Sequence, residues 1–233
     1  MLLRQLANRK IRILTINFLL MKGKGKFIRN IIFDLGGVLL ELDVQKTFDA
    51  FGEIGLTKEI MMKRYNSEGN FFLQFEKGQI SANEFRASLR KTIGNSVSDG
   101  KVDYAWNEML RGFRDDTIRL LSDLSGKYPL YLLSNTNEIH LPVYSEQFRE
   151  TSGGTILQKY FIETYYSHII GTRKPEPESF RHVLKDAGIN PKETLFIDDF
   201  EENCTTAREI GLVAHQLKPE ENLRDVLERY LPG

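Results

Sequence analysis

Four short apolar runs in this sequence end in, or lead into, side chains that suit phosphate and divalent-cation chemistry. Asp34 follows "IIF", Ser134-Asn135 follow "PLYLL", Lys174 stands in "GTRKPEPESF" after a third run, and Asp198-Asp199 follow "TLFI". Such runs are typical of strands that are covered on both faces of a parallel sheet. Because the carboxyl ends of parallel strands share one edge, we expect these side chains to converge there.

Each of these residue types has a defined task in phosphoryl transfer. The Asp34 carboxylate could attack phosphorus and so divide one difficult displacement into two easier steps. Asp34, the Asp198-Asp199 pair and a backbone carbonyl would form an oxygen-only site of the kind Mg²⁺ prefers. The hydroxyl, amide and ammonium groups of Ser134-Asn135 and Lys174 could hold the phosphate oxygens. Lys174 would also favour the ionised form of Asp34 by proximity.

The elements that must position these groups alternate between strands and helices. Apolar runs predict five strands, over Ile31–Asp34, Pro129–Leu133, Tyr165–Ile170, Thr194–Asp198 and Val213–Leu217. Predicted helices begin at Asp115, after Pro175 and at Glu201, and they end at Gly126, Gly188 and Gly211. This alternation predicts an α/β fold with a doubly wound parallel sheet and right-handed crossovers.

Residues 44–112 depart from this alternation, because they contain no convincing strand. They predict several helices with aromatic faces, one of which begins with a capping box formed by Ser81 and Glu84. We therefore expect a helical cap, residues 44–112, inserted after the first strand into a core made of residues 27–43 and 113–233. An insert at this point would lie over the ligand-binding edge of the sheet.

Composition narrows the class of protein. The chain has 41% hydrophobic and 27% charged residues, as globular proteins do, and a single cysteine, Cys204, which favours a reducing compartment such as the cytoplasm. Residues 1–30 carry eight basic and no acidic residues, which leaves 24 basic against 32 acidic residues elsewhere. This anionic body predicts no nucleic-acid partner. Residues 1–26 are interpreted as a basic extension or as a mispredicted start before Met21, and their apolar run is too short to span a bilayer.

The motifs resemble those of the haloacid dehalogenase (HAD) superfamily. "IIFDLGGVL", "LLSNTN", "RKPEPESF" and "LFIDDFEEN" are similar, in order and spacing, to its four motifs, over about residues 28–217. Together with "EKGQIS" at residues 76–81, they most resemble the subgroup of α-D-glucose-1-phosphate phosphatases and epoxide hydrolase N-terminal phosphatase domains. The resemblance implies a Rossmann-like core with strand order 5-4-1-2-3, a C1-type helical cap, and a Mg²⁺ cofactor.

The resemblance also implies a role for each matching residue. Asp34 matches the nucleophile, Lys174 a catalytic and phosphate-binding lysine, and Ser134 and Asn135 the phosphate-holding pair. Metal ligands would be Asp34, the Gly36 carbonyl, Asp199 and, through water, Asp198, with Asn203 in support. Glu76 and Gln79 are candidate substrate contacts from the cap.

Gly36 departs from the pattern of most family phosphatases, which place an aspartate there as the general acid for the leaving group. That acid is worth roughly 10²–10⁴-fold in rate. The subgroup named above also carries glycine at this position. We therefore predict a phosphatase of a small phosphorylated metabolite, with a preference for anomeric sugar phosphates, whose leaving groups need less protonation. We expect a monomer without a membrane partner.

Two alternatives remain open at this stage. A 2-haloacid dehalogenase would use Asp34 to attack carbon and would need no Mg²⁺, which leaves Asp198-Asp199 unexplained. A catalytically weak or inactive module that binds a phosphometabolite or a protein would be consistent with Gly36 and with the basic N-terminal residues.

Overall fold

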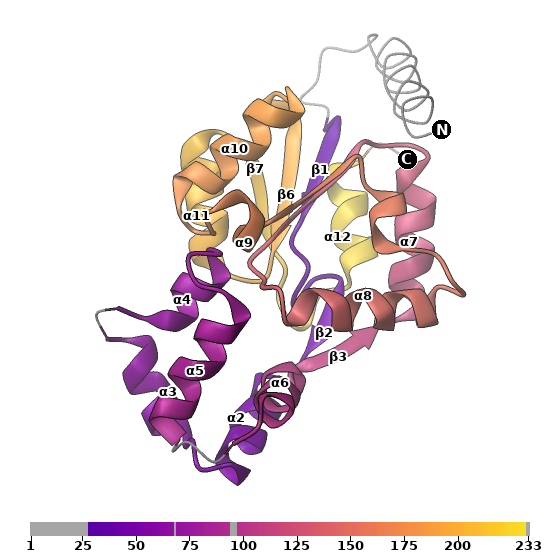
Figure 1. Ribbon diagram of the computed structural model, residues 1–233. Coiled ribbons are helices and arrows are strands. Elements are labelled where there is room, and N and C mark those ends of the chain that lie inside the picture. Colours follow the sequence, from indigo (N-terminus) through magenta and orange to yellow (C-terminus); the bar gives the residue numbers. More distant parts are fainter. Residues whose placement is uncertain (1–27, 68, 94–96, 232–233) are drawn as a thin grey trace, which may run out of the picture.

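A five-stranded parallel sheet forms the centre of the fold (Figure 1). The computed structural model describes residues 28–67, 69–93 and 97–231, so the interpretation of residues 1–26 lies outside the described chain. The strands are β1 (Asn30–Phe33), β4 (Leu130–Ser134), β5 (Glu163–Tyr166), β6 (Thr194–Asp198) and β7 (Val213–Gln216), in the order β5-β4-β1-β6-β7. This confirms the predicted α/β class and sheet order, with the first strand in the middle.

Both faces of the sheet are covered by helices, which explains why the three inner strands β1, β4 and β6 are largely apolar without alternation. Ile31 and Phe33 face one apolar cluster and Ile32 faces the other. The first cluster includes residues of α7 (Asp115–Ser125), α8 (His140–Thr151) and α12 (Leu223–Tyr230); the second includes residues of α10 (Pro177–Ala187) and α11 (Glu201–Ile210). The two groups of helices lie on opposite sides of β1 in Figure 1.

The helix ends follow the predicted stop residues. α7 is followed by Gly126, and α10 and α11 end at Gly188 and Gly211, both in the left-handed conformation that glycine adopts without strain. These glycines turn the chain back into the next strand, so that every strand presents its carboxyl end at the same edge.

The strand predicted over Tyr165–Ile170 is wrong in its last four residues. β5 ends at Tyr166, and residues Ser167–Ile170 form the short helix α9. The partner strand β4 ends at Ser134, which is paired with Tyr166, so the ladder has no partner for residue 167. The Ser167 hydroxyl instead accepts a hydrogen bond from the Thr136 N–H and donates one to the Thr136 carbonyl.

A second group of helices packs around its own aromatic cluster. These are α2 (Val44–Glu53), α3 (Lys58–Tyr65), α4 (Phe71–Glu76), α5 (Ala82–Ile93) and α6 (Asp99–Asn107). Phe51, Phe75, Phe85 and Trp106 are among the buried members of the cluster. The predicted capping box is present, because Glu84 accepts from the Ser81 N–H and Ser81 accepts from the Glu84 N–H. The boundaries given above for core and cap stay a prediction.

A small antiparallel sheet connects these helices to the central sheet. It pairs β2 (Leu40–Leu42) with β3 (Leu110–Phe113). The expectation that residues 44–112 contain no strand is therefore wrong for the last three of them; the strand is short and contains Gly112, so its sequence carries little β signal. The other short elements are the 3-10 turns η1 (Leu157–Tyr160) and η2 (Pro191–Glu193). Among the described residues, no helix has the length and apolarity to cross a membrane.

Candidate active site

Asp34 lies at the carboxyl edge of the central strand. Its N–H donates to the carbonyl of Ile197 at 2.9 Å, which extends the β1–β6 pairing by one residue, and its Oδ1 accepts from the Leu35 N–H at 2.7 Å. The residue is 7% exposed. The carboxylate is thus held in place at the end of β1 with one edge at the surface of the site.

The glycine after Gly36 allows the chain to pass close to a second carboxylate. Gly37 has φ of +75°, and a β-carbon there would lie 2.3 Å from Oδ2 of Asp199. Only glycine fits this position, both for its backbone conformation and for its approach to the carboxylate. The loop after β1 therefore brings Asp34 and Asp199 to one site.

Lys174 reaches the same point from the loop between α9 and α10. Its Nζ lies 2.6 Å from Oδ1 of Asp34 and 2.6 Å from Oδ2 of Asp198, and the residue is 1% exposed. Asn135 holds its backbone on both sides: the Lys174 N–H donates to Asn135 Oδ1 at 2.9 Å, and Asn135 Nδ2 donates to the Lys174 carbonyl at 2.8 Å. The structure gives Asn135 this positioning contact, while Ser134 is buried at the end of β4.

Burial dominates the ionisation of this group. It raises the pKa of Asp34 to about 7, against the lowering effect of Lys174 and with further raising by Asp198 and Asp199. The expectation that Lys174 keeps Asp34 ionised is therefore right in direction, but desolvation outweighs it. Burial lowers the pKa of Lys174, but the two carboxylates outweigh this effect and the net pKa is raised, so the lysine stays a cation.

The two adjacent aspartates have different surroundings. Asp198 is fully buried, and its oxygens accept from Lys174, from the Phe200 N–H at 2.9 Å and from Asn203 Nδ2 at 2.8 Å. Asp199 Oδ1 is buried and has no hydrogen-bond partner among the described residues. Burial, and then Asp198, raise the pKa of Asp199 to about 6.

A cation would satisfy this arrangement. Asp34, Asp198 and Asp199 each offer one oxygen, and these oxygens lie within 4.8 Å of one another. A buried carboxylate oxygen without a partner is costly, and it is the position that a hard divalent ion would occupy. The donor set consists of oxygen atoms only, as Mg²⁺ requires.

The two residues predicted as substrate contacts, Glu76 and Gln79, differ in their surroundings. Glu76, at the end of α4, pairs with Arg173, with 2.8 Å between Oε2 and Nε; burial raises the pKa of Glu76, and Arg173 partly offsets the shift. Gln79 is exposed in the turn that follows. Sequence reasoning missed Arg173, and the only available signal was its position directly before Lys174.

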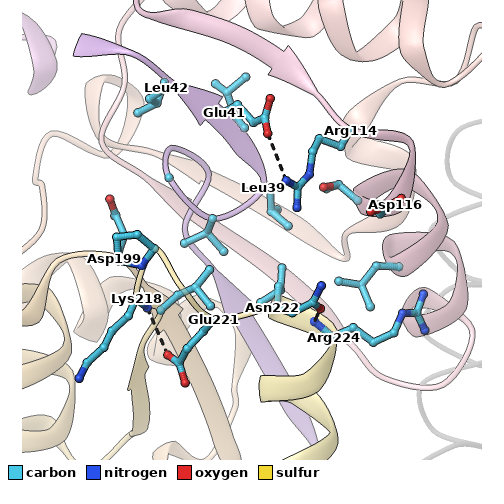
Figure 2. A pocket seen from close by; sticks show the side chains of 18 of the residues that line it. Leu39, Glu41, Leu42, Arg114, Asp116, Asp199, Lys218, Glu221, Asn222 and Arg224 are labelled. Carbon is cyan, nitrogen blue, oxygen red and sulfur yellow. Dashed lines mark hydrogen bonds and ion pairs between the residues drawn. The ribbon is translucent and has the colours of Figure 1, made fainter. Parts of the chain in front are cut away.

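A cavity of about 820 Å³ is bordered by Asp199 (Figure 2). Its lining includes Gly37 and Asp199 but not Asp34, Ser134 or Lys174. Five basic and five acidic residues line it, among them Arg114 and Glu41, whose Nη1 and Oε1 atoms lie 3.4 Å apart. The cavity is therefore adjacent to the candidate metal site through Asp199.

Comparison with known proteins gives consistent matches. The family model described as haloacid dehalogenase-like hydrolase matches residues 28–211. The D-ribitol-5-phosphate phosphatase of Bacteroides thetaiotaomicron is 35% identical over 194 residues, which cover 81% of this chain and 91% of that protein. A HAD family enzyme of the same organism, solved in complex with magnesium and inorganic phosphate, has a TM-score of 0.79 and 40% identity over 86% of this chain and 100% of its own. A predicted HAD-like hydrolase from Porphyromonas gingivalis has a TM-score of 0.78 and 33% identity, covering 87% and 97% of the two chains.

Proposed function

The chain belongs to the haloacid dehalogenase-like hydrolase family, and from this premise we propose that it is a Mg²⁺-dependent phosphatase of a small phosphomonoester. The observation that carries the proposal is the buried cluster of Asp34, Asp198, Asp199 and Lys174 at one edge of the sheet. It combines a nucleophile, an oxygen-only cation site and a buried cation.

The proposed cation site uses Asp34, Asp199 and the carbonyl of Gly36, with Asp198 acting through water. The free oxygen of Asp199 supports a direct contact, and the saturated hydrogen bonding of Asp198 supports an indirect one. When bound, a divalent cation would neutralise phosphate charge that otherwise repels the Asp34 carboxylate. Asn203 would support the site through its bond to Asp198.

The protein residues would act in two steps. The Asp34 carboxylate attacks phosphorus, the substrate oxygen leaves, and an aspartyl-phosphate forms; water then cleaves the acyl phosphate and releases phosphate. Lys174, held by Asn135, would stabilise charge on the phosphoryl oxygens together with Ser134. We also propose that the helices of residues 44–112 form a cap that excludes bulk water from these steps.

For the substrate, we propose a phosphorylated sugar or sugar alcohol, with glucose 1-phosphate as the first candidate. The missing acid at Gly36 supports an anomeric phosphate, because its alcohol leaves more readily. The relative that acts on D-ribitol 5-phosphate makes that ester the second candidate. Equal turnover of glucose 1-phosphate and glycerol phosphate would count against the argument from the leaving group.

A panel of phosphate esters assayed with Mg²⁺ and with EDTA tests the proposal. We expect phosphate release that needs the metal and that disappears in Asp34→Asn, which keeps the shape of the side chain and removes the nucleophile. Phosphate release that persists in Asp34→Asn would contradict the proposal. Binding of phosphate esters without turnover would favour an inactive module, and chloride release from 2-haloacids without metal would favour a dehalogenase.

From the single, buried Cys204 we also infer a reducing, cytoplasmic environment, and we propose a monomer.

A further inference from the structure

Two ion pairs with opposite polarity join α4 to the loop that carries Lys174. Glu76 Oε2 lies 2.8 Å from Arg173 Nε, and Lys77 Nζ lies 2.8 Å from Glu176 Oε1. The first pair places the acid on the group of helices within residues 44–112, here called the helical insert, and the base on the core. The second pair reverses this order. Crossed charges of this kind fix one register, because a slip of one residue would bring like charges together.

The backbone next to these pairs is in direct contact with the core. Gly78 has φ of +64°, and a β-carbon there would lie 2.1 Å from the carbonyl oxygen of His168 in α9. The N–H of Ala82, at the start of α5, donates to the carboxylate of Glu138. The segment 76–82 therefore contacts the core at α9, at residues 173–176 and at Glu138. In Figure 1 it lies beneath α9.

These contacts do not hold Lys174 itself. Its backbone is fixed on the core by the two bonds to Asn135, and its Nζ by Asp34 and Asp198. Breaking the ion pairs should thus free the helical insert while the phosphate end of the site keeps its geometry.

We propose that Glu76–Arg173 and Lys77–Glu176 form a clamp that closes the insert over the site, so that the insert contacts the leaving group. The four side chains are positioning residues: they act through the closed arrangement and not on the phosphate. The inference rests on the proposed phosphatase function for its substrate readout. Its structural part, the closure, stands without it.

A double-mutant cycle tests the pairing. Glu76→Gln and Arg173→Gln should each lower kcat/KM for the preferred sugar phosphate by ~10- to 100-fold, since misplacement of a closing element has effects of this size. p-Nitrophenyl phosphate, whose leaving group needs neither protonation nor contact with the insert, should change by less than ~3-fold. The double variant should be no worse than either single variant, because the two residues share one interaction.

The chain offers a matched control for the charge change. Arg86 and Asp103 also form an ion pair, 2.7 Å long with side chains 17% and 29% exposed, but both residues lie in the helical insert. The Glu76–Arg173 side chains are similarly buried, at 20% and 18%. Arg86→Gln should leave the ratio of the two substrates unchanged; if Glu76→Gln and Arg173→Gln behave like Arg86→Gln, the clamp is wrong.

A steric variant tests the same closure without a change in charge. Gly78→Ala places a methyl group against the His168 carbonyl and should reproduce the selective loss seen with Glu76→Gln. Gly69→Ala is its control, because Gly69 also lies in the insert with φ of +73° but an added β-carbon would meet nothing within 4 Å. Equal effects of the two alanine variants would attribute the loss to backbone strain and overturn the inference.

Hydrogen exchange separates failure of the clamp from failure of the proposed function. Amides of residues 76–82 and 167–171 should exchange faster in Glu76→Gln and Gly78→Ala than in the wild-type protein and the two controls. Unchanged exchange would overturn the clamp whatever the activity. A wild-type protein that hydrolyses no phosphate ester with Mg²⁺, but shows the expected exchange, would overturn the phosphatase proposal alone.

Discussion

The Nζ atom of Lys174 lies 2.6 Å from Oδ1 of Asp34, at the carboxyl edge of the sheet, and both residues are less than one tenth exposed. The same nitrogen lies 2.6 Å from Asp198. The lysine is therefore the counter-charge for two buried carboxylates as well as a candidate phosphate ligand. Its removal should affect stability and activity together.

Lys174→Met tests this dual role. Methionine has nearly the same length but no charge, so Asp34 and Asp198 would be left without their shared cation. Removing one partner of a buried ion pair costs about 3–5 kcal/mol, and we expect a loss of this size in the free energy of unfolding at neutral pH, measured with urea. Phosphatase activity should also disappear. The exposed Lys185→Met is the control; equal stabilities of the two variants would contradict the argument.

Asp199→Asn tests the cation site through stability. Mg²⁺ should raise the melting temperature of the wild-type protein, because ligand at a hundred times its Kd stabilises by about 2.7 kcal/mol. Asp199 offers the buried oxygen that lacks a protein partner, so Asp199→Asn should lose most of this shift. Without Mg²⁺ the variant should melt at or above the wild-type temperature, since one of three crowded carboxylates is removed. Glu209→Gln, on an exposed face of α11, should keep the full shift.

The sequence predicted the sheet and the convergence of its polar ends for a clear physical reason. The run Thr194–Asp198 is buried on both faces and followed by polar residues, and β6 has these bounds. Parallel strands bring their carboxyl ends together regardless of how far apart they lie in the sequence. Asp34, Lys174 and Asp198 accordingly meet. The strand predicted over Tyr165–Ile170 is too long, because composition does not reveal that the neighbouring strand β4 has already ended at Ser134.

Other features of the site depend on contacts that composition and periodicity do not encode. Asp198 and Asp199 are chemically identical neighbours, and only the structure shows that one is saturated with hydrogen bonds while the other has a free oxygen. Glu76 and Arg173 are 97 residues apart, and neither belongs to an apolar pattern that would place it. The pairing with Arg173 occupies the Glu76 carboxylate that the sequence suggests as a substrate contact.

Gly36→Asp tests whether the missing general acid limits the choice of leaving group. Gly36 is not in the left-handed region, and the atom nearest to an added β-carbon would be Cδ1 of Leu42, at 2.7 Å. Leu42 is 38% exposed, so the end of its side chain can move away. We expect turnover of glycerol phosphate to rise by about tenfold, below the ~10²–10⁴-fold of a fully positioned acid. p-Nitrophenyl phosphate should change little. Gly36→Asn has the same size without the proton, so an equal rise in both variants would refute the argument.

His140 links the end of the helical insert to the core, and its protonation in the folded protein costs free energy. Its Nδ1 lies 2.8 Å from Oδ1 of Asn107, its ring stacks on Trp106, and the residue is 7% exposed. Burial lowers the pKa of His140 to about 3. The unfolded chain, with a histidine pKa near ~6.5, binds the proton first as the pH falls. The stability that neutral His140 contributes is therefore fully present above pH ~6.5. As the pH falls from there to the folded pKa, the free energy of unfolding declines by up to about 1.4 kcal/mol per pH unit.

His140→Gln should remove this pH dependence while keeping a polar group that can reach Asn107. Between pH 7 and pH 5, the wild-type free energy of unfolding should fall by about 2 kcal/mol more than that of the variant, as measured by urea denaturation at each pH. His182→Gln, at an exposed position of α10, should follow the wild-type profile. Parallel profiles for His140→Gln and the wild-type protein would show that His140 takes up its proton in the folded state, and that the contact with Asn107 opens without unfolding.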